Sequence, residues 1–441
     1  MGGDSSSEEV GLDLLQQLEL ILEHDKLIDE VGFVHPDQFP ALNEGPSSSL
    51  SPVCILGQSA ADILNKDTVE LHVVQYDEKV FWNKDHKLAI SILVLPQLYN
   101  AALNAYMDAN RRYKQSIRSQ INKGSFDDAN CGCDFDQFLE SEVLKHTRAL
   151  LILSYDFKSA WNSRKLVLSR KQELSLFVDE FQLSALILSY APKSEGAWSH
   201  RQWTVKMIAE KVHDLQELVK KESELVKNIA EKSKMNYRAW NHRCWLVLYM
   251  TESQVLDELN MSRKWAELHV ADNCCFHYRR RLMLRILSNG DVKEGGEKPF
   301  NYNSNVYAVW KELQWNKLLI QRYIGREALW IHRRFLSQCW IKHFANNQKS
   351  SSPHIEATGL DDFLGEEFEL MNACLNTQTD DELDDYQSQA KHAVSYILWI
   401  SKQIPSCSEV KLQERLKEAV NFEDLFMKYP ERLMLWKKVL V

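Results

Sequence analysis

The 441-residue sequence contains little glycine and proline and no long apolar run. It has 15 glycines and 10 prolines, which favours a chain built mainly of helices. No stretch approaches the roughly 18 apolar residues that can cross a bilayer, so we expect no integral membrane protein. The first residues, Met1–Glu9, lack the basic and apolar regions of a signal peptide, so a cytoplasmic protein is expected.

The sequence also lacks the signatures of a self-sufficient enzyme. It contains no Gly-rich phosphate loop and no Gly-x-Ser-x-Gly turn. Its nine cysteines are odd in number and scattered, which suggests no disulfide framework and fits a reducing compartment. The clustered thiols at Cys131–Cys133 and Cys274–Cys275 have no second pair at zinc-site spacing, so no metal site is predicted in this chain. The net charge of −9 argues against nucleic acid as a main partner.

What the sequence does contain is a recurring aromatic residue followed three positions later by arginine. The pairs are Trp161 and Arg164, Trp198 and Arg201, Trp240 and Arg243, Phe276 and Arg279, and Trp330 and Arg333. The aromatic positions are 37, 42, 36 and 54 residues apart. A period of about 35 to 45 residues is typical of helical-repeat arrays. The pattern therefore predicts an all-α chain in which helical hairpins stack into an α-α superhelix, or solenoid.

Within each copy, the aromatic residue and the arginine share one helical face. We expect the Trp to fill the seam between neighbouring hairpins. The Arg can bond carbonyls at the end of an adjacent helix or stack on the next Trp. The segments ahead of the copies read as partner helices, with acids such as Glu180 and Glu258 on the face opposite the apolar one.

Five regions are predicted along the chain. Residues 1–60 form an N-terminal extension, partly disordered, with an acidic tail over residues 1–10. Residues 61–137 form a helical region with a short extended segment at Thr68–Val74 and a long helix at Leu88–Ile121, kinked at Pro96. The five repeats occupy 138–345, a flexible linker 346–360, and a C-terminal helical region 361–441.

One edge of the array is a candidate anion site. Lys193 and Arg238 lie at the loop-to-helix junctions of consecutive repeats, and such junctions line one edge of a stacked array. Tyr237 adds a hydroxyl there, and the helix N-termini add partial positive charge. The junction is therefore a candidate diphosphate site, with a solvated lysine as the alternative reading.

Two motifs carry a resemblance to a known family. Pro192–Lys193 ahead of Trp198 and Arg201, and Asn236–Tyr237 ahead of Trp240 and Arg243, resemble the protein prenyltransferase α-subunit repeat. A closer resemblance, to a divergent α member of the family similar to the α subunit of a third type of geranylgeranyltransferase, is carried by Asp29–Gly32, His269–Arg279 and Gly325–Arg333.

The resemblance implies a right-handed superhelix wrapped around a separate β subunit, with the Rab geranylgeranyltransferase β subunit favoured. That β subunit would hold zinc and the isoprenoid pocket, so this chain alone would hold no cofactor and be inactive. The isoprenoid diphosphate would be a co-substrate, and a geranylgeranyl group would pass to proteins with a C-terminal cysteine. Lys193 would stabilise the leaving diphosphate, while Asn236, Tyr237 and Arg238 would help to bind it.

The sequence departs from the family pattern at one position near this site. Glu195 occupies the place of the tyrosine in the second repeat, and its carboxylate would repel phosphate unless paired with Lys193 or shielded by a metal ion. A non-catalytic helical-repeat scaffold for protein–protein interaction therefore remains the alternative. The isoprenoid and the modified proteins are left open.

Overall fold

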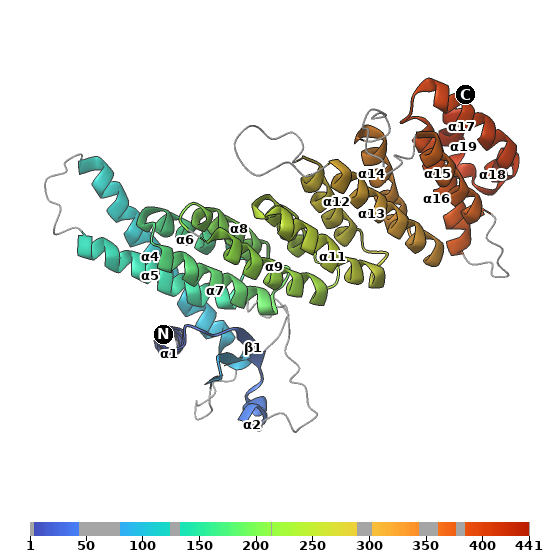
Figure 1. The fold of residues 1–441 in the computed structure, drawn as a ribbon. Coiled ribbons are helices and arrows are strands. Elements are labelled where there is room, and N and C mark those ends of the chain that lie inside the picture. Colours follow the sequence, from blue (N-terminus) through green and yellow to red (C-terminus); the bar gives the residue numbers. More distant parts are fainter. Residues whose placement is uncertain are drawn as a thin grey trace. The chain divides into compact units, whose positions relative to one another are not determined.

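A computed structural model describes residues 4–43, 80–123, 133–212, 214–288, 302–343, 360–375 and 384–440 (Figure 1). The chain divides into two units, Met1–His242 and Arg243–Val441, each treated by itself below. The division falls inside helix α10, in the third predicted repeat.

The N-terminal unit joins a small sheet to consecutive helices. Its elements are α1 (Asp4–His24), β1 (Glu30–Val34), η1 (Pro36–Gln38), α2 (Phe39–Asn43), β2 (Phe81–Lys84), β3 (Lys87–Ser91), η2 (Ile92–Val94), α4 (Leu95–Lys123), α5 (Cys133–Leu153), α6 (Lys158–Lys171), α7 (Leu174–Tyr190), α8 (Glu195–Ala209), α9 (Leu215–Lys232) and the start of α10 (Tyr237–Leu246).

The described residues of the C-terminal unit are helical throughout. The elements are the end of α10, η3 (Val247–Tyr249), α11 (Glu252–Leu268), α12 (Asn273–Ser288), α13 (Tyr302–Arg322), α14 (Glu327–His343), α15 (Leu360–Leu375), α16 (Asp384–Ser401), α17 (Ser406–Ala419), α18 (Phe422–Lys428), η5 (Pro430–Arg432) and α19 (Leu433–Leu440). Among the described helices of both units, none combines the length and apolar character needed to cross a bilayer.

The repeats are helical hairpins, numbered in chain order as α5–α6, α7–α8, α9–α10, α11–α12 and α13–α14. Helix α5 packs against α6, α7 against α8, α11 against α12, and α13 against α14. In each hairpin the second helix carries the aromatic residue and the arginine, and all ten of these side chains are buried. The repeat region is thus an all-α solenoid segment in each unit.

Buried glutamates join consecutive hairpins. Glu180 on α7 accepts a hydrogen bond from Arg164 of the preceding hairpin (Nε to Oε2, 2.9 Å), and His200 Nε2 of its own hairpin lies 2.6 Å from Oε2. Burial alone would raise the pKa of Glu180, but the Arg164 charge and the His200 hydrogen bond outweigh it and hold the pKa at about 2. The expectation that Glu180 and Glu258 lie on the face opposite the apolar one is wrong, because both side chains are buried against arginines.

The same arrangement recurs along the chain, with tyrosine replacing histidine twice. We call these acids the bridging glutamates: Glu180 with Arg164 and His200, Glu222 with Arg201 and His242, Glu258 with Arg243 and Tyr278, Glu312 with Arg279 and His332, and Glu367 with Arg333 and Tyr396. The last set belongs to α15 and α16, so this pattern of contacts continues beyond residue 345.

The repeat arginines also bond backbone carbonyls. Arg164 Nη1 donates to Leu144 O (2.6 Å) and Arg201 Nη1 to Phe181 O (2.8 Å). Each acceptor lies within the first helix of the same hairpin rather than at a helix end. A lysine could not reach the carboxylate and the carbonyl together, because only the guanidinium presents several donors in a fixed plane.

The aromatic rings lie on the next hairpin's histidine or tyrosine. Ring centroids are 4.5 Å apart for Trp161 and His200 and 5.1 Å apart for Trp198 and His242. In the C-terminal unit, Phe276 lies 5.2 Å from His332, and Trp330 lies 5.5 Å from Tyr396. Each of these four rings therefore fills the space between one hairpin and the next.

The N-terminal region, predicted to be helical, contains a three-stranded sheet. Its order is β1-β3-β2, with β1 parallel to β3 (Val31 opposite Leu88) and β2 antiparallel to it. Strand β1 packs against α7, while α1 packs against α4 and α5. The extension is therefore folded onto the first repeats, and residues 4–10, predicted as a disordered tail, begin α1.

The predicted start of the long helix at Leu88 is wrong, because the helix begins later in the structure. The strand β3 and a short 3-10 turn occupy Lys87–Val94, and α4 starts at Leu95. Pro96 is therefore in the first turn of α4, where a missing N–H costs nothing, rather than at a kink. The predicted extended segment Thr68–Val74 and residues 346–359 of the predicted linker lie outside the described residues.

Candidate functional site

The loop between α7 and α8 carries Lys193. Ser194 caps α8, since its Oγ accepts from Ala197 N (3.1 Å) and donates to Asp156 Oδ1 (2.7 Å). Trp198 Nε1 donates to Pro192 O (2.9 Å). The backbone on both sides of Lys193 is thus held by its own repeat and the preceding one.

The following repeat also holds this loop. Asn236 Nδ2 donates to Pro192 O (2.6 Å), and Arg238 Nε donates to Lys193 O (2.9 Å). The Lys193 side chain itself is exposed. The third repeat therefore fixes the position of the lysine of the second repeat.

The polar atoms of Asn236 are engaged within the fold. Asn236 is fully buried, and its Oδ1 accepts from Ala239 N (3.1 Å), as a helix N-cap does. This placement leaves Asn236 to position the Lys193 loop. Tyr237 is 60% exposed.

Glu195 pairs with Arg238 rather than with Lys193. Arg238 Nη2 lies 3.3 Å from Glu195 Oε2, and both side chains are about half exposed. This pair partly neutralises the carboxylate, although exposed pairs contribute little stability. The Lys193 ammonium has no ion-pair partner within the described part of the chain.

Gly196 is a positioning residue that the sequence analysis missed. A Cβ at this position would lie 2.5 Å from Trp161 Nε1, so any larger residue would collide with the buried indole. Glycine therefore lets the N-terminus of α8, which follows Lys193, approach the first repeat closely.

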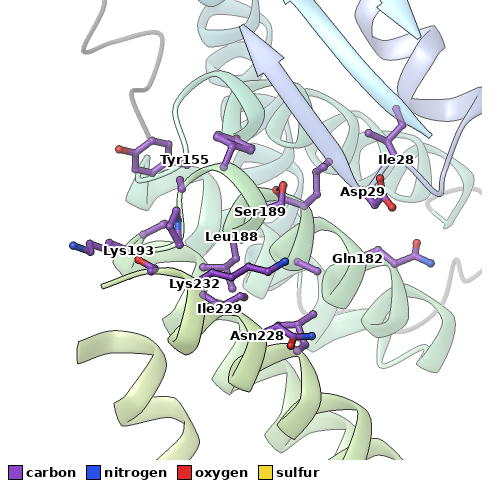
Figure 2. A pocket seen from close by; sticks show the side chains of 18 of the residues that line it. Ile28, Asp29, Tyr155, Gln182, Leu188, Ser189, Lys193, Asn228, Ile229 and Lys232 are labelled. Atoms are coloured by element: carbon purple, nitrogen blue, oxygen red, sulfur yellow. Dashed lines mark hydrogen bonds between the residues drawn. The ribbon is translucent and has the colours of Figure 1, made fainter. Parts of the chain in front are cut away.

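A pocket of about 1080 Å³ lies beside the loop, within the N-terminal unit (Figure 2). Helices α7 and α9, the Lys193 loop and the segment Lys26–Asp29 line it, and the lining is mainly apolar. Figure 2 shows the Lys232 side chain lying across the pocket, whereas Lys193 extends away from the other labelled side chains. Lys232 carried no sequence signal, since it is one of several lysines on α9.

The repeats match a known family model. The protein prenyltransferase alpha subunit repeat matches residues 177–208, 219–250 and 255–286. These segments correspond to the second, third and fourth hairpins, while the first and fifth share the same buried contacts without a match.

Curated relatives match about half of the chain. Protein prenyltransferase alpha subunit repeat-containing protein 1 of Homo sapiens is 28% identical over 263 residues, which is 50% of this chain and 64% of that protein. The Danio rerio protein of that name is 30% identical over 50% of this chain and 61% of its own length. The chain thus matches about three fifths of the length of these relatives.

A more distant relative carries an enzyme-subunit name. Geranylgeranyl transferase type-2 subunit alpha of Rattus norvegicus is 23% identical over 45% of this chain and 34% of that protein. Together with the family model and the hairpins, these matches show that this chain contains protein prenyltransferase alpha subunit repeats and is similar to proteins named for that repeat.

Proposed function

We propose that this chain is the α subunit of a heterodimeric protein prenyltransferase that transfers a geranylgeranyl group to cysteine thiols of proteins. Its partner would be a β subunit of the Rab geranylgeranyltransferase type. The similarity to a chain named geranylgeranyl transferase type-2 subunit alpha supports the transferred group. A cytoplasmic location is part of the proposal, and the described buried thiols, such as Cys275, are free as in a reducing compartment.

The geometry of the Lys193 loop is the observation that carries this proposal. Contacts from Asn236, Arg238 and Trp198 fix its backbone, while the ammonium stays exposed. A charge presented on a fixed backbone stabilises a transition state without reorganising during the reaction. Such a lysine suits a leaving group that gains negative charge.

The proposed reaction is alkylation of sulfur. A substrate thiolate attacks C1 of the geranylgeranyl diphosphate, the C1–oxygen bond breaks, and diphosphate leaves with the electron pair. Lys193 would offset the charge that builds on the diphosphate, with Tyr237 and Arg238 at the same edge. Zinc, bound by the β subunit, would keep the thiol deprotonated.

Co-expression tests the proposal. The chain is tagged, produced with each prenyltransferase β subunit in turn, and the purified pair is given labelled geranylgeranyl diphosphate and a cysteine protein. We expect Lys193→Ala to slow transfer roughly 10²-fold without loss of the complex. The matched control is Lys158→Ala, an exposed lysine at the start of α6 in the first repeat, which should leave the rate unchanged. If Lys193→Ala transfers the geranylgeranyl group at the wild-type rate, Lys193 does not stabilise the leaving diphosphate.

The Glu195–Arg238 pair favours a second candidate, a helical-repeat scaffold without catalysis, because it places a carboxylate beside the proposed diphosphate site. The same experiment separates the two. A chain that is stable alone and retains no β subunit supports the scaffold.

A further inference from the structure

The pocket beside α7 and α9 has an apolar floor and a polar rim. Leu186 and Leu188 are buried beneath it, and Ile229 lines it from α9. Its volume of about 1080 Å³ slightly exceeds the range of roughly 300–1000 Å³ for small-molecule sites. The space is therefore sufficient for a long apolar chain.

One wall of the pocket comes from outside the repeats. Residues Lys26–Asp29 follow α1 and precede β1, which packs against α7. Ile28 is buried, whereas Leu27 is 59% exposed at the rim. The repeat model begins at residue 177, so the N-terminal extension completes a pocket that the repeats alone would leave open.

Lys232 places a positive charge over the apolar floor. Its side chain lies across the pocket in Figure 2, and within the described residues it has no ion-pair partner. The lining contains three acids, Asp29, Asp156 and Glu224, and among the described contacts none of them pairs with Lys232. Asp156 accepts hydrogen bonds from Ser194 Oγ and Gly196 N, and Glu224 lies eight residues before Lys232, roughly 12 Å along the axis of α9. The Lys232 end of the pocket is thus the end that suits an anion.

We propose that this pocket binds an anionic amphiphile, with its apolar chain on the floor formed by α7 and α9 and its diphosphate or carboxylate head at Lys232. The apolar chain supplies affinity by leaving water, and the ammonium selects the charged head. Binding requires neither a β subunit nor transfer, so this inference stands apart from the proposed enzymatic role.

Binding to the purified full-length chain tests the inference. The probes are geranylgeranyl diphosphate, palmitate, inorganic diphosphate and the uncharged alcohol geranylgeraniol, measured by calorimetry. We expect geranylgeranyl diphosphate to bind at least tenfold more tightly than inorganic diphosphate or geranylgeraniol. If palmitate binds with similar affinity, the site accepts any anionic head group. If palmitate binds much more weakly, the site is selective for a diphosphate head group. Both results agree with the inference. Inorganic diphosphate or geranylgeraniol binding as tightly as geranylgeranyl diphosphate would overturn it.

Two variants locate the ligand. Lys232→Ala should weaken binding of the charged amphiphile at least tenfold and leave geranylgeraniol unchanged, while the control Lys220→Ala, exposed on α9 and outside the lining, should change neither. Ser189→Trp, at an exposed position in the lining, should abolish binding by filling the pocket. Circular dichroism checks that each variant is folded. Wild-type affinity in either Lys232→Ala or Ser189→Trp would refute the site.

Discussion

Replacing Glu180 by Gln should destabilise the N-terminal unit by about 3 kcal/mol. The glutamate is 1% exposed and lies between Arg164 of one hairpin and His200 of the next. Glutamine keeps the shape but removes the charge that faces the buried guanidinium. Removing one partner of a buried ion pair costs roughly 3–5 kcal/mol because the other charge stays buried without compensation.

The pKa of Glu180 gives a similar magnitude. The difference between its usual pKa of 4.5 and about 2 in the fold corresponds to roughly 3–4 kcal/mol, at about 1.4 kcal/mol per pKa unit. Because the folded pKa is depressed, this stability is present above pH 4.5 and is lost as the pH falls towards about 2. The Gln variant should lack this acid-dependent loss.

Urea unfolding at pH 7, followed by circular dichroism, measures the effect, and amide hydrogen exchange locates it. Protection should fall first in α6, α7 and α8, since stability in a repeat array is local. Asp179→Asn, on the exposed face of the same helix, is the control and should stay within about 0.5 kcal/mol of wild type. Equal effects from the two variants would refute the bridging role.

Three further outcomes are expected. Burial lowers the pKa of His200 below 6.5, so this histidine is protonated at a higher pH in the unfolded chain than in the folded one. Stability should therefore fall as the pH falls, and the urea midpoint should be lower at pH 5.5 than at pH 7.5. The decrease should be smaller in His200→Gln. Asn236→Ala should cost about 2 kcal/mol in thermal unfolding, because both the helix cap and the bond to Pro192 are lost, while Tyr237→Phe should cost almost nothing. Trp198→Ala should cost roughly 3–5 kcal/mol in urea, and Trp198→Phe clearly less, because a smaller cavity remains.

The hairpins could be predicted because their signal is periodic. Trp and Arg three residues apart recur at the length of a helical pair, so both the repeat and the buried face follow from spacing. The bridging glutamates could not be separated from their neighbours in this way. Asp179 and Glu180 are adjacent acids, and only the arginine of another hairpin decides which one is buried. The available signal was that one such glutamate recurs in the first helix of every hairpin from α7 onward.

The sheet and the pocket depended on contacts distant in sequence. The apolar run at Leu88–Val94 fits a strand or a helix equally well, and pairing with Glu30–Val34 decides for the strand. The ligand role of Lys193 stays a prediction. The ligand role of Asn236 also stays a prediction, and the structure adds that its side chain holds the Lys193 loop and caps α10.

The direction of the bridging contacts has a consequence for synthesis on the ribosome. Each repeat arginine finds its carboxylate in a hairpin that follows it in the chain, as Arg201 does in Glu222. When a repeat arginine has just been synthesised, its partner glutamate has therefore not yet been translated, and the buried ion pair can form only after the first helix of the next hairpin has emerged. The partner of Arg333 is Glu367 on α15. A chain truncated after residue 345 would therefore end in a repeat whose arginine lacks its carboxylate partner.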